Sequence, residues 1–193
     1  MEFVHLSWEI VCFHFFCMNF SEIYISDRIL YDNALTDKSS NYTVSPGASF
    51  TFDIDHYIFS QTSNSMVELI TGYDNVQFEV LLKHGNNAGG IIISESSLNF
   101  SPGVGLYNNA SNTTYLGLFP WQNVKSQNNV TNNNDYYRYI LIINGSSISA
   151  RIENTNGNIL FSGTTSKSLS ENHFNLFSPA NTVYIKEISI KPL

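Results

Sequence analysis

Hydrophobic and polar residues alternate with a period of two along most of the chain after residue 27. The alternation is clearest in two late segments, an aromatic and β-branched run over residues 136–143 and a strictly alternating run over residues 148–153. Successive side chains of a strand point to opposite faces, so these runs predict half-buried β-strands. The Asn144-Gly145 pair between them predicts a tight hairpin turn of type I′.

The same reading predicts roughly ten strands, at the spacing typical of a sandwich or barrel. No helical period persists after the first segment, and no linker or internal repeat is visible. We therefore predict an all-β fold, an antiparallel jelly-roll sandwich of two sheets, over residues 18–193. The expected strands cover residues 29–31, 50–58, 76–83, 91–93, 104–107, 115–119, 136–143, 146–153, 159–162, 174–177 and 183–191.

Two further features of this pattern can be tested against the structure. In the last strand, Val183 and Ile185 have one parity and Ile188 and Ile190 have the other, which predicts a β-bulge near residues 186–187. Residues 121–135 are rich in asparagine and lack apolar alternation, so we expect a long loop there.

Residues 1–17 (MEFVHLSWEIVCFHFFC) differ from the rest of the chain. The segment is aromatic and apolar, but it begins with an acidic residue, and it lacks the basic start and small-residue cleavage site of a secretory signal. It is also short for a membrane span of about 20 residues. We predict that Met18 is the native start and that residues 1–17 are an upstream extension. The alternative is a divergent signal or anchor.

The composition describes a polar but weakly charged surface. Charged residues make up 13% of the chain and the net charge is −7, whereas asparagine and serine number 24 and 25. Nucleic-acid binders need a basic footprint, and the sequence contains no cluster of lysine or arginine, so we expect no nucleic-acid partner. The amide and hydroxyl groups suit contacts with a glycan or a capsid neighbour, although tolerant loops also accumulate such residues.

The order of several segments resembles the concanavalin A-like lectin/glucanase superfamily, including its laminin-G-like jelly rolls. The resemblance covers about residues 27–193 and implies a two-sheet sandwich. Similar domains occur on microbial surface proteins and on viral tail appendages. The segments that carry the resemblance are QFEVLL (77–82), AGGIII (88–93), GVGLY (103–107), residues 136–151 and residues 183–193.

The resemblance also raises the question of catalysis. The glucanase branch cuts glycans with carboxylates in a Glu-x-Asp-x-x-Glu arrangement, which this sequence does not contain. Asp53 and Asp55 are two positions apart and are expected on one face of one strand, where they could bind calcium or lie exposed to solvent. His84 and His173 lie beside turn residues and are expected at the surface. We predict a non-catalytic member with no required cofactor, calcium being the candidate metal.

Sugar recognition is the binding chemistry that the aromatic and amide side chains favour. Pyranose faces stack on aromatic rings, and sugar hydroxyls pair with amides and carboxylates. Strand ends and loops around the Asn-rich segment carry both kinds of side chain, although such aromatics can instead fill the core, as expected for Tyr115. The predicted ligand-binding residues are Tyr107, Asn108, Trp121, Asn123 and Tyr136.

Three functions follow from these observations. The first is a non-catalytic recognition module that binds a glycan or surface polymer, outside the cell, on a cell surface or on a virion. The second is a structural jelly roll whose main partner is itself or a larger tail or capsid assembly. The third, a degenerate glycoside hydrolase, is disfavoured by the missing carboxylates.

Overall fold

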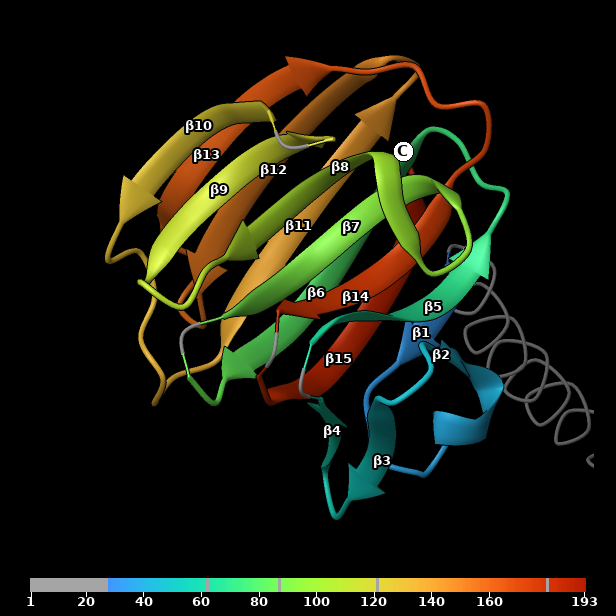
Figure 1. Cartoon of the computed structure of the whole chain (residues 1–193), viewed down its shortest axis with the longest axis vertical. Coiled ribbons are helices and arrows are strands. Elements are labelled where there is room, and N and C mark those ends of the chain that lie inside the picture. Colours follow the sequence, from blue (N-terminus) through green and yellow to red (C-terminus); the bar gives the residue numbers. More distant parts are fainter. Residues whose placement is uncertain (1–27, 62, 87, 121, 180) are drawn as a thin grey trace, which may run out of the picture.

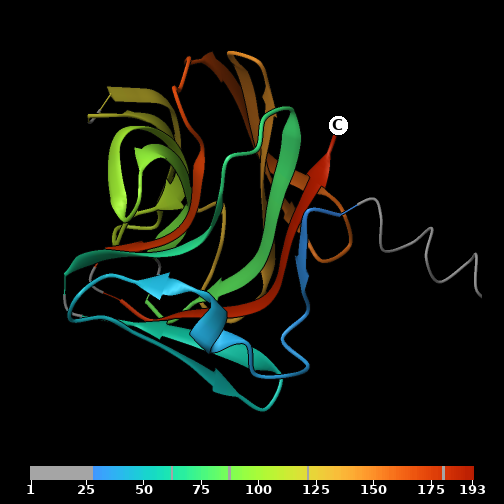
Figure 2. The same cartoon turned by 90° about the vertical axis from the view of Figure 1, so that its right-hand side faces the viewer.

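Two antiparallel β-sheets packed face to face make up the fold (Figures 1 and 2). The computed structural model describes residues 28–61, 63–86, 88–120, 122–179 and 181–193, so the predictions for residues 1–17 and Trp121 lie outside the described residues. Within these ranges the chain forms fifteen strands and one short 3-10 turn, η1 (Ser39–Asn41). No helix among the described residues is long and apolar enough to span a membrane. The predicted all-β jelly-roll sandwich is confirmed.

Sheet A brings together strands from both ends of the sequence. A short strand, β1 (Leu30–Asp32), pairs with β15 beside the main order of the sheet. From one edge to the other, the strands are β13 (Ile159–Ser166), β12 (Ser147–Asn154), β11 (Tyr137–Asn144), β6 (Val76–His84), β15 (Val183–Pro192), β4 (His56–Ser60) and β3 (Ser49–Asp53).

Sheet B contains the remaining strands, and Figure 1 looks onto its outer face. In order they are β10 (Gln122–Asn128), β9 (Thr113–Phe119), β8 (Asn99–Asn108), β7 (Gly89–Ser96), β14 (His173–Pro179), β5 (Asn64–Thr71) and β2 (Thr43–Val44). Strand β5 was missed in the sequence because its buried residues do not alternate with exposed ones: the consecutive residues Ser65, Met66 and Val67 are all buried.

Alternating side chains from both sheets fill the space between them. In β6, every second residue is buried, and Phe78 meets Phe174 of the opposite sheet edge to face, with ring centroids 5.4 Å apart. Full burial of such a side chain contributes about 1.5–3 kcal/mol. The alternation that predicted the strands therefore also identifies the core.

The β11–β12 hairpin and the bulge in β15 were both predicted from the sequence, and the turn differs in detail. Strands β11 and β12 pair as expected, with Asn144 opposite Ser147, so the two-residue turn is Gly145-Ser146 rather than Asn144-Gly145. Of these two turn residues only Gly145 has a positive φ, +58°, which fits type II′ and corrects the predicted type I′. The predicted bulge is confirmed, since the register of β15 against β6 shifts between Ile185 and Glu187.

The single strand expected over residues 50–58 is wrong. The chain reverses at Ile54 and Asp55, so β3 and β4 form a hairpin in which Asp53 pairs with His56. Ile54 lies at the tip, with φ +56° and 85% exposure. The sequence alternates through the turn, so its pattern does not reveal the reversal.

Strand β10 corrects the loop expected over residues 121–135. All its residues are exposed, because it forms the edge of sheet B, and it therefore lacks the apolar alternation of a half-buried strand. Its side chains reach β13, the edge strand of sheet A. Lys125 Nζ donates a hydrogen bond to the Ser162 carbonyl, and Gln127 Nε2 donates one to the Leu160 carbonyl at 3.5 Å.

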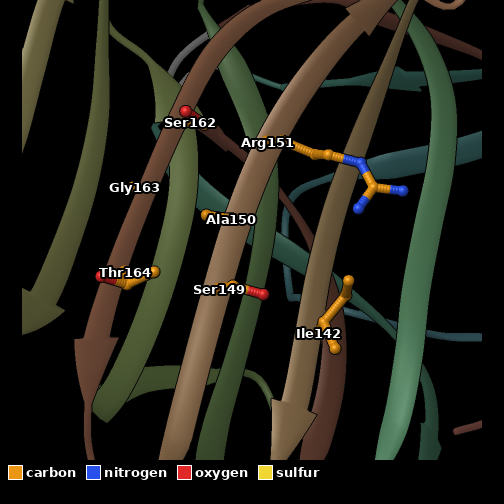
Figure 3. A pocket seen from close by; sticks show the side chains of 7 residues that line it. All are labelled: Ile142, Ser149, Ala150, Arg151, Ser162, Gly163 and Thr164. Carbon is orange, nitrogen blue, oxygen red and sulfur yellow. The ribbon is translucent and has the colours of Figure 1, made fainter.

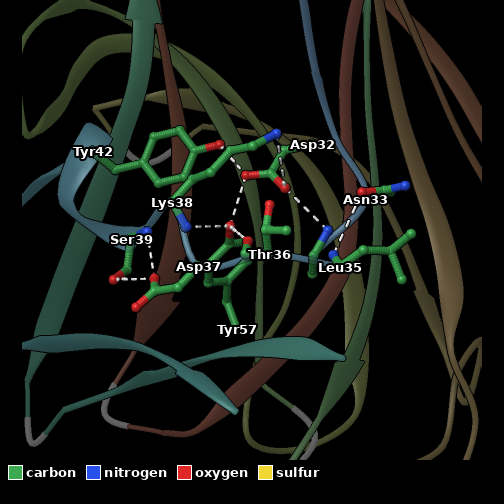
Figure 4. A network of polar contacts seen from close by, with 10 residues as sticks. Asp32, Asn33, Leu35, Thr36, Asp37, Lys38, Ser39, Tyr42 and Tyr57 are labelled. Carbon is green, nitrogen blue, oxygen red and sulfur yellow. Dashed lines mark hydrogen bonds and ion pairs between the residues drawn. The ribbon is translucent and has the colours of Figure 1, made fainter. Parts of the chain in front are cut away.

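A buried carboxylate fastens the segment after β1 to the β3–β4 hairpin (Figure 4). The hydroxyls of Tyr42 and Tyr57 donate to Asp32 Oδ2 at 2.6 and 2.8 Å, and the Ala34 N–H donates to Oδ1 at 3.0 Å. Lys38 Nζ lies 3.9 Å from the same carboxylate. Burial, followed by the Asp32 contact, raises the pKa of both tyrosines. Because the Asp32 oxygens already have protein partners, this network is best read as structural.

Candidate functional site

An aromatic cluster lies on the outer face of sheet B, separate from the core between the sheets. Its buried members are Met66, Ile92, Tyr107, Phe119 and Phe177. Glycines of β7 and β8 make room for it: a Cβ at Gly90 would lie 2.5 Å from the Tyr107 Cα and closer still to the Leu106 carbonyl oxygen. At Gly105, a Cβ would lie 2.8 Å from the Phe119 ring. The sequence therefore replaces side chains with glycine where the rings cover the sheet.

Tyr107 is the centre of this cluster. Its ring stacks on Tyr115 with centroids 5.5 Å apart and on Phe119 at 5.8 Å, and it meets Phe177 edge to face at 5.7 Å. Burial, with a smaller contribution from Tyr115, raises the Tyr107 pKa to about 12. Tyr115 is the more exposed end of the stack, and Asn109 Nδ2 donates to its hydroxyl at 3.4 Å. The Tyr115 ring is thus held in place by neighbours yet accessible to a ligand.

An open hollow of about 330 Å³ lies beside the stack. Strand register places Phe177 and Tyr107 on either side of Gly90, so β7 contributes no side chain there. Within the described part of the chain, the amides of Asn64 and Asn123 have no hydrogen-bond partner. The residues that line the hollow are Asn64, Tyr107, Asn109, Tyr115, Asn123, Phe177 and Pro179.

The hollow combines some of the predicted ligand-binding residues with others that the sequence did not suggest. Tyr107 and Asn123 were predicted, and the structure brings them together. Tyr115, expected in the core, lines the hollow as well. Asn64 and Phe177 come from strands far apart in sequence, and only the pairing of β5 with β14 places them here. Trp121 lies outside the described residues, so its predicted role stays a prediction.

The structure places Asn108 away from the hollow, in the interior. Its side chain is fully buried, and its Oδ1 accepts hydrogen bonds from Thr114 Oγ1 at 2.8 Å and from the Tyr139 hydroxyl at 3.0 Å. Its Nδ2 donates to Thr131 Oγ1 at 2.6 Å. Both ends of the amide therefore have protein partners, and the proposed ligand site leaves Asn108 out.

His84 extends this interior network and corrects the expected surface position. It is fully buried, and its Nε2 lies 2.7 Å from the Tyr139 hydroxyl. Burial lowers the pKa of His84 to about 4, so the imidazole is neutral at neutral pH. Its position at the end of β6, before Gly85, resembled a surface turn in the sequence; the parity of β6 points it inward with Leu82.

Tyr136 lies on the opposite side of the molecule from the hollow, on the outer face of sheet A. The ammonium groups of Lys83 and Lys186 lie 5.3 and 5.0 Å from its ring centroid. It immediately precedes β11, which belongs to sheet A. Tyr136 therefore cannot share a ligand with Tyr107 at the same hollow.

The predicted metal residues lie at the β3–β4 turn. Asp53 ends β3 and Asp55 lies in the turn, so the two carboxylates do not share one strand face as expected. Asp55 contacts Lys186 Nζ at 2.9 Å and His56 Nδ1 at 3.0 Å, and these contacts, the histidine's first, lower its pKa. No group of three or more metal-ligating side chains occurs among the described residues. Calcium binding at Asp53 and Asp55 stays a prediction.

A second hollow, of about 240 Å³, crosses strands β11–β13 of sheet A (Figure 3). Its lining is mostly small: Ser149, Ala150, Ser162, Gly163 and Thr164, with Ile142 and Arg151. Figure 3 shows the Arg151 guanidinium pointing away from Ser162 and Thr164, and its Nε donates to Glu153 Oε1 at 2.6 Å. The hollow contains no aromatic side chain among its described lining residues, so it offers no platform for a sugar ring.

Comparison with known proteins identifies the fold. No protein-family model matches the sequence, and no curated protein matches it. The structure is similar to the carbohydrate-binding module CBM66 from Bacillus subtilis, with TM-score 0.64 and 13% identity, over 81% of this chain and 98% of the module. The winged bean acidic lectin complexed with methyl-alpha-D-galactose gives TM-score 0.64 and 6% identity, over 83% and 96%. The fold is a concanavalin A-like jelly roll.

An enzyme shares this fold as well. The Crh5 transglycosylase in complex with NAG gives TM-score 0.63 and 12% identity, over 84% of this chain and 83% of the enzyme. At such identities the similarity shows the concanavalin A-like jelly roll alone, because one fold can carry many functions. The chemistry of the site therefore depends on the residues of this chain.

Proposed function

We propose that the protein is a non-catalytic recognition module that binds a glycan in the hollow on the outer face of sheet B. The observation that carries the proposal is the meeting of an accessible Tyr115 ring with the unpartnered amides of Asn64 and Asn123. Aromatic faces and converging amides are the groups that bind the two sides of a sugar ring. The carbohydrate ligands named for similar structures support the same class of ligand.

The lining of the hollow favours binding over catalysis. Glycoside hydrolysis ordinarily uses two carboxyl groups that flank the scissile bond. None of the described residues that line the hollow carries a carboxylate. The glucanase motif is also missing from the sequence. A location outside the cell, on a cell surface or virion, belongs to the same proposal.

A glycan array followed by calorimetry tests the proposal. We expect Tyr115→Ala to weaken binding of the best glycan about tenfold, or about 1.4 kcal/mol, because the variant loses both the stacking and the buried area of the ring. Tyr73→Ala is the matched control, since Tyr73 is an exposed tyrosine outside the hollow. The folded wild-type protein binding no glycan would contradict the proposal, and so would an equal loss in both variants.

The enzyme alternative is tested on the same ligands. We expect no increase in reducing ends when the protein is incubated with any glycan it binds. Hydrolysis that disappears in the Tyr115→Ala variant would instead place a catalytic site at this hollow and overturn the non-catalytic assignment. Hydrolysis that both proteins share equally would exclude this hollow as the catalytic site.

A further inference from the structure

The aromatic and cationic cluster around Tyr136 plays no part in the proposed glycan site. It lies on the outer face of sheet A, where strand register pairs Tyr184 of β15 with Lys83 of β6. The Lys83 ammonium lies 5.3 Å from the Tyr136 ring centroid and 4.9 Å from that of Tyr184. The Lys186 ammonium also lies near the Tyr136 ring, at 5.0 Å from its centroid. Two ammonium groups thus converge on a single tyrosine.

Lys83 differs in its charge balance from the basic residues of this face that form ion pairs. Arg138 pairs with Glu79 and Glu187, and Lys191 lies 3.9 Å from Glu79. Arg151 pairs with Glu153, and Lys186 pairs with Asp55. Within the described ranges, Lys83 has no carboxylate within 4.0 Å, and its ammonium lies near two tyrosine rings. Its charge is therefore not neutralised by the protein.

This arrangement favours an anion physically. Two like charges near one ring repel each other, and the repulsion at a protein surface is stronger than in bulk water because the effective dielectric constant is lower. An anionic group between them removes that cost. Burial raises the pKa of Tyr136, so its hydroxyl stays protonated and can donate a hydrogen bond to the same anion. Asp55 supplies part of this negative charge, but it contacts Lys186 and not Lys83.

We propose that Lys83, Lys186 and Tyr136 form a second binding site, for an oxyanion carried by an acidic polysaccharide. Ammonium groups bind both carboxylates and sulfate esters through charge-assisted hydrogen bonds, so a uronate and a sulfated sugar share the required chemistry. The tyrosine rings beside the lysines provide an apolar surface for the sugar that carries the anion. The site lies on the other sheet from the glycan hollow, so the two ligands do not compete.

Calorimetry with defined polymers tests this site. The probes are polygalacturonate for carboxylates, dextran sulfate for sulfate esters, and unmodified dextran as the neutral control, each at low and at physiological salt. We expect at least one acidic polymer to bind and the affinity to fall as salt rises. The polymer that binds more tightly identifies which oxyanion the site takes. Binding of neither acidic polymer would overturn the proposal.

Matched variants separate the site from general charge. Lys83→Gln should weaken binding of the acidic polymer about tenfold, whereas Lys83→Arg, which keeps the charge, should stay within about threefold. Lys191→Gln changes the net charge by the same amount on the same face, and it should change the affinity less than twofold, because Glu79 already neutralises Lys191. An equal loss in Lys83→Gln and Lys191→Gln would overturn the proposal.

Asp55 gives a test in the opposite direction. Because its carboxylate competes for the Lys186 ammonium, Asp55→Asn should tighten binding of the acidic polymer about threefold. Weaker binding of this variant would mean that Asp55 holds a cation that bridges to the polymer, which would overturn the oxyanion site and favour the predicted calcium. Thermal unfolding of each variant checks that the hairpin remains folded.

Discussion

The outer face of sheet B carries stacked aromatic rings over glycines, whereas the outer face of sheet A carries lysines, arginines and glutamates in ion pairs. Both faces use strands of the same sandwich, and both are open to solvent. The two faces differ in which polar groups are left without a protein partner. Among the described residues, the hollow of sheet B contains amides without hydrogen-bond partners beside a ring, and the Lys83 ammonium of sheet A has no carboxylate within 4.0 Å. This difference supports the proposal of a neutral ligand for sheet B and an acidic ligand for sheet A.

The largest effect should come from filling the glycine surface of sheet B. A Cβ at Gly90 would meet backbone atoms of β8, so Gly90→Ala should lower the free energy of unfolding by about 3 kcal/mol or more. In sheet A, the nearest atom to a Cβ at Gly163 is the flexible end of Leu116 at 3.0 Å, and Gly163→Ala should cost less than about 1 kcal/mol. Urea titration at neutral pH measures both, and similar losses would mean that close packing is not specific to sheet B.

The next largest effect concerns the pH dependence of stability, which His84 causes from the interior between the two sheets. The pKa of His84 is about 4 in the folded protein, below the ordinary histidine value of about 6.5, so the unfolded chain binds more protons between these two pH values. The stabilisation from neutral His84 is therefore present above pH 6.5 and is lost as pH falls towards 4. We expect the free energy of unfolding to drop by about 2 kcal/mol between pH 7 and pH 4.5.

A substitution shows whether this pH effect belongs to His84. In His84→Gln, which keeps a polar group beside Tyr139, the decrease between pH 7 and pH 4.5 should shrink by about 2 kcal/mol. Urea titrations at the two pH values, for wild type and variant, provide the measurement. An unchanged decrease in the variant would assign the acid sensitivity to the carboxylates of the outer faces instead.

The two tyrosines give the most direct comparison of the faces. With a neutral glycan as ligand, Tyr115→Ala should weaken binding about tenfold, and Tyr136→Ala should leave it unchanged. With an acidic polymer the order should reverse, because the ammonium groups of Lys83 and Lys186 lie 5.3 and 5.0 Å from the Tyr136 ring centroid. Calorimetry with both ligands and both variants measures the four values. One variant that weakens both ligands would show a single shared site.

The smallest effect concerns the ion pairs of sheet A. Arg138 contacts Glu79 and Glu187 and is partly exposed, so Arg138→Gln should lower the free energy of unfolding by about 1 kcal/mol. The difference from wild type should shrink at high salt, because exposed charges are screened. Chemical unfolding in urea at two salt concentrations checks it. A loss that does not depend on salt would indicate packing of the arginine stem rather than charge.

The sequence predicted the parts of the fold in which side chains alternate clearly between the two faces of a strand. The β11–β12 hairpin, the bulge in β15 and the buried face of β6 follow from side-chain parity alone. Strand β10 was missed because an edge strand exposed on both faces has no apolar period. The β3–β4 turn was missed because Ile54 continues the alternation through the reversal.

The candidate site was only partly predictable for a related reason. Tyr107 and Asn123 could be named because aromatic and amide side chains are visible in the sequence. Asn108, next to Tyr107, has the opposite parity and points into the core, which a reliable strand assignment would have revealed. Asn64 joins the site only through the pairing of β5 with β14. Long-range pairing of this kind leaves no local signal in a single sequence.

The contacts between β10 and β13 have a consequence for solubility. The carbonyl groups along the outer edge of a sheet can recruit a strand from another molecule and so begin aggregation. Here Lys125 and Gln127 occupy the Ser162 and Leu160 carbonyls, and a charged lysine lies where an incoming strand would have to pair. In a chain with few charged residues, Lys125 thus disfavours aggregation through the β13 edge of the sandwich.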